Sequence, residues 1–366
     1  MKSVISRIFI VLFGCLFAFA VGEITLRWFG YAASDIYTQG KQGLLILNPN
    51  KKIHIRNACF QNDVKTNSFG FHSREYSLEK PEGVFRIALI GDSFIEAMQV
   101  KQDKTVAALL EQKLNSLNSR LYRYEVIPFG ISSHGTYKNI LYFENYAAQF
   151  KPDLVIDALA LNDIEDDFLE SDIFFDQDDK LVMRPVFSQP GGVLKPVKKI
   201  LRKSVLITTL RKSYLIFKSN PKKNSDKLSP SVEILLSEYN DLWQEAWVLQ
   251  KKLLKNLNET AARNNSSFML ISLTDGYRVH SDLLEKFKAT TQGNSIDLDK
   301  PEKILSSIAQ ENSFSYLALN PLFRDRAQRE RGITVWPCDG HWNEKGHEWT
   351  ADALFDYLVL QKLISD

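Results

Sequence analysis

From about residue 84 onward, compact apolar runs recur along the chain, and each stops abruptly at a glycine or a polar residue. Apolar runs of this length without polar alternation are typical of strands that are buried on both faces of a sheet. Strands are therefore predicted at residues 84–90, 125–129, 153–161, 267–273 and 315–319.

Stretches with apolar residues at helical spacing separate these runs. Helices are predicted over residues 105–117, 139–150, about 230–264 and about 344–360. Asp103 or Thr105 can cap the first helix. Ser229 and Asn343 can cap the long helix and the last one, and Pro230 suits the first helical position. Alternation of buried strands with such helices indicates a parallel sheet that is covered on both faces.

The start of the chain carries the signal for a membrane. Lys2 and Arg7 precede an apolar run from Ile8 to Val21, which is short for a spanning helix of roughly 20 residues. Ala18-Phe19-Ala20 is a small-x-small pattern of the kind that signal peptidase cleaves. Residues 1–30 are interpreted as a cleaved signal peptide or, with slight preference, an uncleaved anchor extended by the apolar residues that follow. Both place the rest of the chain outside the cytoplasm.

The rest of the chain divides by composition. Residues 31–80 are polar and are expected to be irregular, whereas residues 81–366 are expected to form the α/β domain. The strand–helix alternation breaks over about residues 165–265, where a mostly helical insertion is expected. Within it, the basic and apolar stretch of residues 195–218 is interpreted as a pair of ordinary helices in preference to a helix lying on anionic lipid.

Overall composition is that of an ordinary globular protein. Of the 366 residues, 44% are hydrophobic and 25% are charged, which argues against a disordered or fibrous chain. The formal net charge of +2 gives no reason to expect a nucleic-acid partner. Cys15, Cys59 and Cys338 lack the spacing of a structural zinc site. Cys59 and Cys338 can pair in an oxidising compartment, and the sequence leaves open whether they do.

Polar groups that suit acyl transfer stand at the ends of the predicted elements. They are Ser93, Gly130 and Asn162 after three of the strands, and Asp339 and His341 before the last helix. The carboxyl ends of parallel strands share one edge of a sheet, so the first three groups are expected to lie close together. A serine hydroxyl becomes a nucleophile when a base such as His341 takes its proton, and Asp339 would hold the other imidazole nitrogen.

The same segments offer donors for an oxyanion. The candidates are the backbone N–H groups of Ser93 and Gly130 and the side-chain amide of Asn162. His134 is a candidate for lining the pocket beside them. The acidic residues 163–167 are interpreted as a hydrated loop in preference to a metal site.

Taken together, these segments resemble the sequence blocks of the SGNH hydrolase superfamily, including membrane-linked bacterial members with a leading apolar helix. The matching segments are Gly91-Asp92-Ser93-Phe94 for the GDS(L/Y/F) block, Gly130 for the glycine block, Asn162-Asp163 for the end of the GxND block, and residues 339–341 for the terminal acid–histidine block. Two positions depart from the pattern. Ala160 replaces the glycine of GxND, and Cys338 stands where the family has its acid, so Asp339 is retained as the acid at a shorter spacing.

The resemblance covers roughly residues 67–163 and 265–360. It implies a three-layer α/β/α fold with a parallel, flavodoxin-like sheet. It also implies an extracytoplasmic serine esterase that cleaves an acyl, often acetyl, ester of a small molecule, lipid or glycan without cofactor or metal. An O-acyltransferase acting on cell-surface polysaccharide and a non-catalytic glycan-binding protein on the same scaffold are the alternatives.

Overall fold

The computed structural model describes residues 2–28, 36–56, 58–117, 122–169, 173–175, 181–183, 204, 206–207, 210 and 228–364. The chain forms two compact units. The N-terminal unit consists of Met1–Tyr37 with Pro185–Lys227, and the α/β unit consists of Thr38–Arg184 with Leu228–Asp366. Every candidate site residue belongs to the α/β unit.

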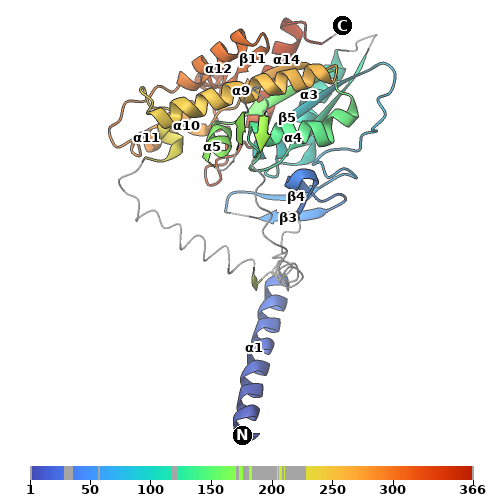
Figure 1. Ribbon diagram of the computed structural model, residues 1–366, viewed down its shortest axis with the longest axis vertical. Helices are drawn as coiled ribbons and strands as arrows, with labels where there is room; N and C mark the ends of the chain where they lie inside the picture. The colour runs from blue at the N-terminus through green and yellow to red at the C-terminus, as the bar shows by residue number, and fades with distance from the viewer. Residues whose placement is uncertain are drawn as a thin grey trace. The chain divides into compact units, whose positions relative to one another are not determined.

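A parallel sheet of five strands is the centre of the α/β unit (Figure 1). Its strands are β5 (Val84–Gly91), β6 (Arg123–Gly130), β7 (Leu154–Leu159), β10 (Ser267–Ser272) and β11 (Ser315–Ala318). Their order across the sheet is β11-β10-β7-β5-β6, which is the flavodoxin-like order 2-1-3-4-5 read from the other edge. The predicted parallel sheet and its five strands are confirmed.

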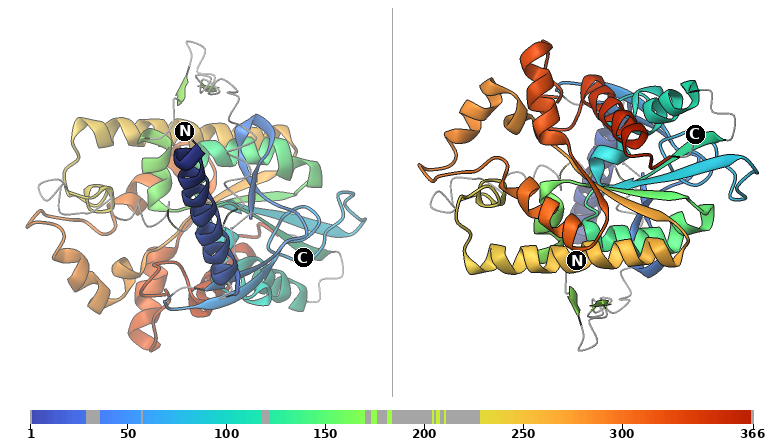
Figure 2. Two further views of the ribbon diagram at one scale, coloured as in Figure 1. Left: turned by 90° about the horizontal axis from the view of Figure 1, so that it is seen from below. Right: turned by 90° about the horizontal axis from the view of Figure 1, so that it is seen from above.

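Helices cover both faces of the sheet, as Figure 2 shows from two sides. Helices α3 (Val106–Ser116) and α14 (Glu344–Leu360) pack against each other on one face. Helices α4 (Thr136–Tyr142), α5 (Leu161–Leu169) and α9 (Asp241–Arg263) pack together on the other, where α9 contacts β10. The expected three-layer α/β/α fold is therefore confirmed.

This unit also contains further strands and α-helices. They are β1 (Tyr37–Gln39), β2 (Leu45–Leu47), β3 (Lys52–Arg56), β4 (Gln61–Lys65), α2 (Ser93–Glu96), β8 (Ile173–Phe175), β9 (Leu181–Met183), α8 (Pro230–Glu233), α10 (Gly276–Val279), α11 (Ser281–Lys288), α12 (Lys300–Glu311) and α13 (Leu319–Arg329). Strands β3 and β4 pair as an antiparallel hairpin. The expectation that residues 31–80 are irregular is wrong where these strands lie, because strands of only three to five residues are too short for a reliable period-2 pattern.

The predicted helix caps agree with the structure at two helices. The Thr105 side chain accepts a hydrogen bond from the backbone N–H of Ala108 (3.3 Å), at the start of α3. The Asn343 side chain accepts one from Gly346 (3.1 Å), at the start of α14. Each side chain satisfies a backbone donor that the first turn of a helix leaves without a partner.

The long helix expected over residues 230–264 is wrong, because it breaks into α8 and α9. Between the two helices, Leu236 forms a β-bridge with Ile296, and this tertiary pairing takes the backbone out of the helix. The chain then restarts at Asn240, whose side chain accepts a hydrogen bond from the Trp243 N–H (3.0 Å). Ser229 precedes Pro230 as expected but makes no side-chain capping bond.

The N-terminal unit contains helix α1 (Lys2–Trp28). Its segment Phe9–Leu26 has a mean hydropathy of 2.3 and none of it is buried, so by length and composition it can cross a membrane. The helix runs well past the apolar stretch that ends at Val21. Near its end, the Glu23 carboxylate accepts hydrogen bonds from the Ser204 hydroxyl (2.9 Å) and the Leu206 N–H (3.0 Å). Most of residues 195–218, expected to be helical, lies outside the described residues.

Candidate active site

The end of β5 presents Ser93 at the edge of the sheet. The strand stops at Gly91, and Asp92 then caps the short helix α2 by accepting a hydrogen bond from the Phe94 N–H (2.9 Å). Ser93 is the first residue of α2, so its hydroxyl lies at the carboxyl ends of the strands. In doubly wound sheets this is the edge where ligands bind.

Ser93, His341 and Asp339 form a continuous hydrogen-bonded relay. The Ser93 Oγ lies 2.7 Å from Nε2 of His341, and Nδ1 of the same ring lies 2.6 Å from Oδ1 of Asp339. The His341 side chain is 27% exposed and that of Asp339 is 14% exposed, so a small molecule can reach the imidazole while the carboxylate is mostly covered. With a proton on Nδ1, the imidazole donates to the carboxylate and its Nε2 accepts from the serine hydroxyl.

A tight turn explains how an acid two residues before the histidine can reach it. Residues 336–341, called the His341 loop below, bend back so that the N–H groups of Asp339 and Gly340 both donate to the Trp336 carbonyl (3.0 and 2.7 Å). Gly340 has a φ of +89°, in the left-handed region that glycine adopts without strain. Cys338, at the family's usual acid position, is instead bonded to Cys59, with a Cα–Cα distance of 6.1 Å.

Aromatic side chains also surround the His341 ring. The Phe94 ring lies 5.1 Å from the His341 ring and 4.9 Å from that of Trp342, measured between centroids. Trp342 is fully buried and donates a hydrogen bond from its indole N–H to the Thr274 carbonyl (3.1 Å). No sequence pattern predicted these contacts; the available signal was only that both aromatics directly follow the relay residues Ser93 and His341.

Gly130 ends β6 beside Gly91 of β5, in the same register. A Cβ atom at Gly130 would lie 2.1 Å from the backbone nitrogen of Glu96, so only glycine allows α2 to approach this strand. The structure thus places Gly130 directly against the helix that carries Ser93. Its role as an oxyanion donor remains a prediction.

Asn162 lies in the first turn of α5, because β7 ends at Leu159, earlier than expected. Its side chain is near the buried Asp92 carboxyl group: a hydrogen bond from Asn162 is among the interactions that lower the pKa of Asp92, against the larger effect of burial, which raises it. Asp92 therefore connects Asn162 to Ser93. Asn162 is exposed, as a group that meets a ligand must be.

Several carboxyl groups at the start of α2 and on β7 and α5 are buried: Asp92, Asp157, Asp163 and Asp167. Burial raises the pKa of Asp157 to about 7 and that of Asp167 to about 8. The interpretation of residues 163–167 as a hydrated loop is wrong. Asp163 and Asp167 stand four residues apart on the inner face of α5, where they accept hydrogen bonds from the N–H groups of Ala160 (3.0 Å) and Tyr137 (3.1 Å).

His134 does not line an open pocket, contrary to the expectation. The residue is 1% exposed, and its ring packs edge-on against Tyr142 at a centroid distance of 5.5 Å. Burial lowers its pKa to about 3, so the ring is neutral at ordinary pH. The loop after Gly130 turns His134 inward, which no local sequence pattern indicates.

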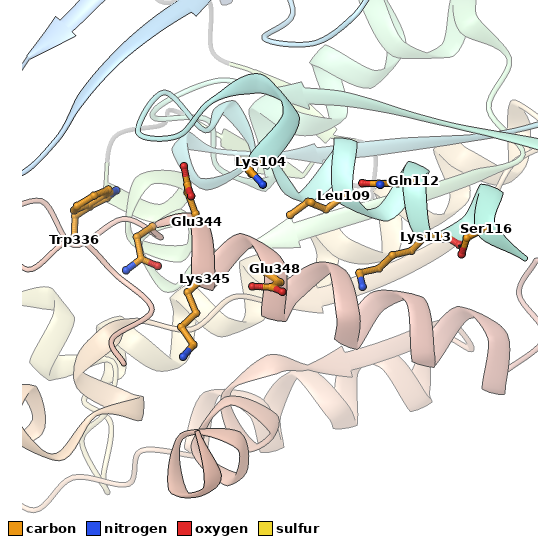
Figure 3. A pocket seen from close by; sticks show the side chains of 10 residues that line it. Lys104, Leu109, Gln112, Lys113, Ser116, Trp336, Glu344, Lys345 and Glu348 are labelled. Carbon is orange, nitrogen blue, oxygen red and sulfur yellow. The ribbon is translucent and has the colours of Figure 1, made fainter. Parts of the chain in front are cut away.

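A surface groove of about 940 Å³ runs between α3 and α14 and reaches the His341 loop at Trp336 (Figure 3). Its lining is polar and of mixed charge: Lys104, Leu109, Gln112, Lys113, Ser116, Trp336, Asn343, Glu344, Lys345 and Glu348. Both helices begin at the edge of the sheet that carries Ser93. Ser93, Asp339 and His341 do not line this groove.

No family model matches this sequence, and no curated protein matches it. Solved structures that resemble it include the acetyl xylan esterase AlAXEase, with 14% identity, a TM-score of 0.44 and coverage of 75% of this chain and 100% of the other. Axe2, an acetylxylan esterase from Geobacillus stearothermophilus, has 13% identity, a TM-score of 0.41 and coverage of 76% and 95%. TesA has 12% identity, a TM-score of 0.40 and coverage of 75% and 97%. Likeness of this degree does not assign an activity.

Proposed function

We propose that this chain is an SGNH-type serine esterase that hydrolyses an acyl ester through a covalent acyl-enzyme. The observation that carries the proposal is the relay from Ser93 through His341 to Asp339, with donor–acceptor distances of 2.7 and 2.6 Å. These three residue types in this order activate a hydroxyl for attack on a carbonyl carbon. The sequence blocks that resemble the SGNH superfamily supply the same three residues.

The reaction follows from the geometry in two halves. Ser93 Oγ attacks the acyl carbon while Nε2 of His341 takes the hydroxyl proton, and Asp339 stabilises the imidazolium through Nδ1–H. His341 then returns the proton to the departing alcohol, which leaves the acyl group on Ser93. In the second half water attacks the acyl carbon, His341 takes the water's proton, and Ser93 is released with that proton as the carboxylic acid departs.

The negative oxygen of each tetrahedral intermediate needs fixed donors. We assign them to the N–H groups of Ser93 and Gly130 and to the Asn162 amide. Support comes from their placement: Gly130 adjoins α2, and Asn162 reaches Asp92 next to Ser93. Removing one such donor typically costs about 10²–10³ in rate.

The reaction is proposed to take place outside the cytoplasm, on a chain that its N-terminal segment either anchors in the membrane or directs to export. Lys2 and Arg7 precede the apolar part of α1, which favours a cytoplasmic N-terminus. The disulfide between Cys59 and Cys338 agrees with an oxidising compartment. A signal peptide and an anchor both fit these observations.

The acyl group is proposed to be small, such as acetyl, on a small molecule, a lipid or a glycan. The same relay with a sugar hydroxyl in place of water would make the chain an O-acyltransferase, and analysis of the products separates the two. A non-catalytic glycan-binding protein would have no need of an intact relay.

The decisive test uses the full chain with p-nitrophenyl acetate and a serine-directed phosphonate. We expect turnover and labelling of Ser93, and a fall in kcat of about 10⁴-fold or more in Ser93→Ala. Ser281→Ala is the matched control, because Ser281 is an exposed serine at the start of α11. Wild-type chain that is neither active nor labelled would contradict the proposal.

A further inference from the structure

The Cys59–Cys338 disulfide joins the His341 loop to a distant part of the chain, because its two cysteines are separated by 279 positions in the sequence. Cys59 lies in the turn of the β3–β4 hairpin. Cys338 is adjacent to Asp339, the residue that contacts Nδ1 of His341. The disulfide therefore restrains the backbone next to Asp339.

The hairpin is in turn fixed to the segment that carries the nucleophile. The Asn62 side chain, on β4, is buried and donates hydrogen bonds to the carbonyls of Met98 (3.0 Å) and Val100 (2.5 Å). These two residues follow α2, whose first residue is Ser93. The hairpin thus supports the acid and the nucleophile from a single element.

The His341 loop has limited support of its own. Pro337, Cys338 and Gly340 are exposed, and the backbone hydrogen bonds of the loop run back to Trp336. Trp336 itself packs against Phe60, the residue after Cys59, at a centroid distance of 5.8 Å. The disulfide and this ring contact hold the same loop against the same hairpin.

We propose that Cys59 and Cys338 are positioning residues, whose disulfide holds Asp339 in hydrogen-bonding distance of His341. This inference rests on the proposed esterase function. A displacement of about 1 Å in a catalytic group can cost about 10²-fold in rate. We expect kcat to decrease and KM to stay nearly the same, because the relay acts in the transition state and not in substrate binding.

The first test replaces both cysteines by serine in the full chain and measures esterase kinetics. We expect kcat to fall by about 10²-fold with KM changed by less than about threefold. Cys15→Ser is the matched control and should have wild-type kinetics, because Cys15 is a free, exposed cysteine of α1. Unchanged kcat in a folded double-serine variant, which cannot form the disulfide, would overturn the inference.

A double-mutant cycle separates positioning of Asp339 from a general structural effect. In an Asp339→Asn background the cysteine changes should lower kcat by less than about threefold, because their target is already lost. If the two effects multiply in full, the disulfide does not act through Asp339 and the inference fails.

Reduction of the folded wild type covers the case in which the cysteine variants do not fold. Dithiothreitol supplies two electrons and two protons, leaves two protein thiols and becomes a cyclic disulfide. We expect kcat to fall on reduction and to recover on reoxidation, while the Cys15→Ser chain responds in the same way. Full activity of a reduced chain, with both thiols confirmed by alkylation, would refute the positioning role. If the oxidised wild type is inactive, the proposed function itself fails, which is a distinct outcome.

Discussion

At the scale of single residues, the spacing of Asp339 and His341 depends on Gly340. A two-residue spacing brings the carboxylate to Nδ1 because the residue between them adopts a left-handed conformation, with φ +89°. The resemblance to the SGNH family left the acid uncertain at this point, since Cys338 occupies its usual position. The turn at Gly340 explains geometrically how Asp339 reaches His341 from the shorter spacing.

Gly340→Ala should therefore lower both stability and kcat. A left-handed conformation costs a residue with a Cβ about 1–2 kcal/mol, and relief of that strain would move Asp339. Gly293→Ala is the matched control: Gly293 has a φ of +82° and open space around its Cα, as Gly340 has, but belongs to a distant loop. Denaturant unfolding should show a similar loss in both variants, whereas kcat should fall only in Gly340→Ala. Equal kcat values would contradict the role given to the turn.

At the scale of elements, strand β7 and helix α5 carry carboxyl groups into the interior. Asp157 on β7 is fully buried, where the side-chain amide of Asn139 donates a hydrogen bond to it (3.0 Å). Burial raises its pKa from 3.8 to about 7. The folded chain consequently keeps a proton that the unfolded chain releases.

Stability should therefore fall as pH rises through this range. The contribution of protonated Asp157 is fully present below about pH 4 and is lost as the pH passes about 7. Asp157→Asn removes this dependence, so the variant should be more stable than wild type by on the order of 4 kcal/mol at about pH 9 and nearly equal at about pH 4. Asp103→Asn, an exposed residue, is the control. The same difference in unfolding free energy between wild type and Asp157→Asn at both pH values would refute this.

At the scale of the whole molecule, the chain combines an apolar N-terminal helix with an α/β unit that contains Ser93, Asp339 and His341. No residue of the segment Phe9–Leu26 is buried and most are exposed, which water disfavours and a bilayer favours. The chain should sediment with membranes and be released by detergent but not by salt. N-terminal sequencing of the mature chain, from both the membrane and the soluble fraction, distinguishes an anchor, which keeps Met1 or Lys2, from a cleaved signal.

Two arginines introduced into the apolar part of this helix provide the control for that prediction. Leu12→Arg with Leu16→Arg should abolish membrane retention, because each arginine costs about 2.5–3.5 kcal/mol at the centre of a spanning helix. Retention of the double variant in the membrane fraction would show that another part of the chain holds it there.

The sequence by itself determined the features that local physics controls. Continuous apolar runs predicted the five strands of the sheet, and Thr105 and Asn343 predicted the starts of two helices, since caps and burial patterns depend on near neighbours. Ser93, His341 and Asp339 could be selected because their chemistry and their places at element ends limit the choices.

Tertiary structure decided what depends on contacts between distant segments. The Leu236–Ile296 bridge broke a helix whose local pattern was continuous, and packing turned His134 and Asp167 inward although both are polar. The Cys59–Cys338 pair was compatible with the sequence but followed only from the approach of a hairpin and a loop 279 residues apart. Such contacts offset the entropy of closing long loops only when the whole fold forms, so no local pattern encodes them.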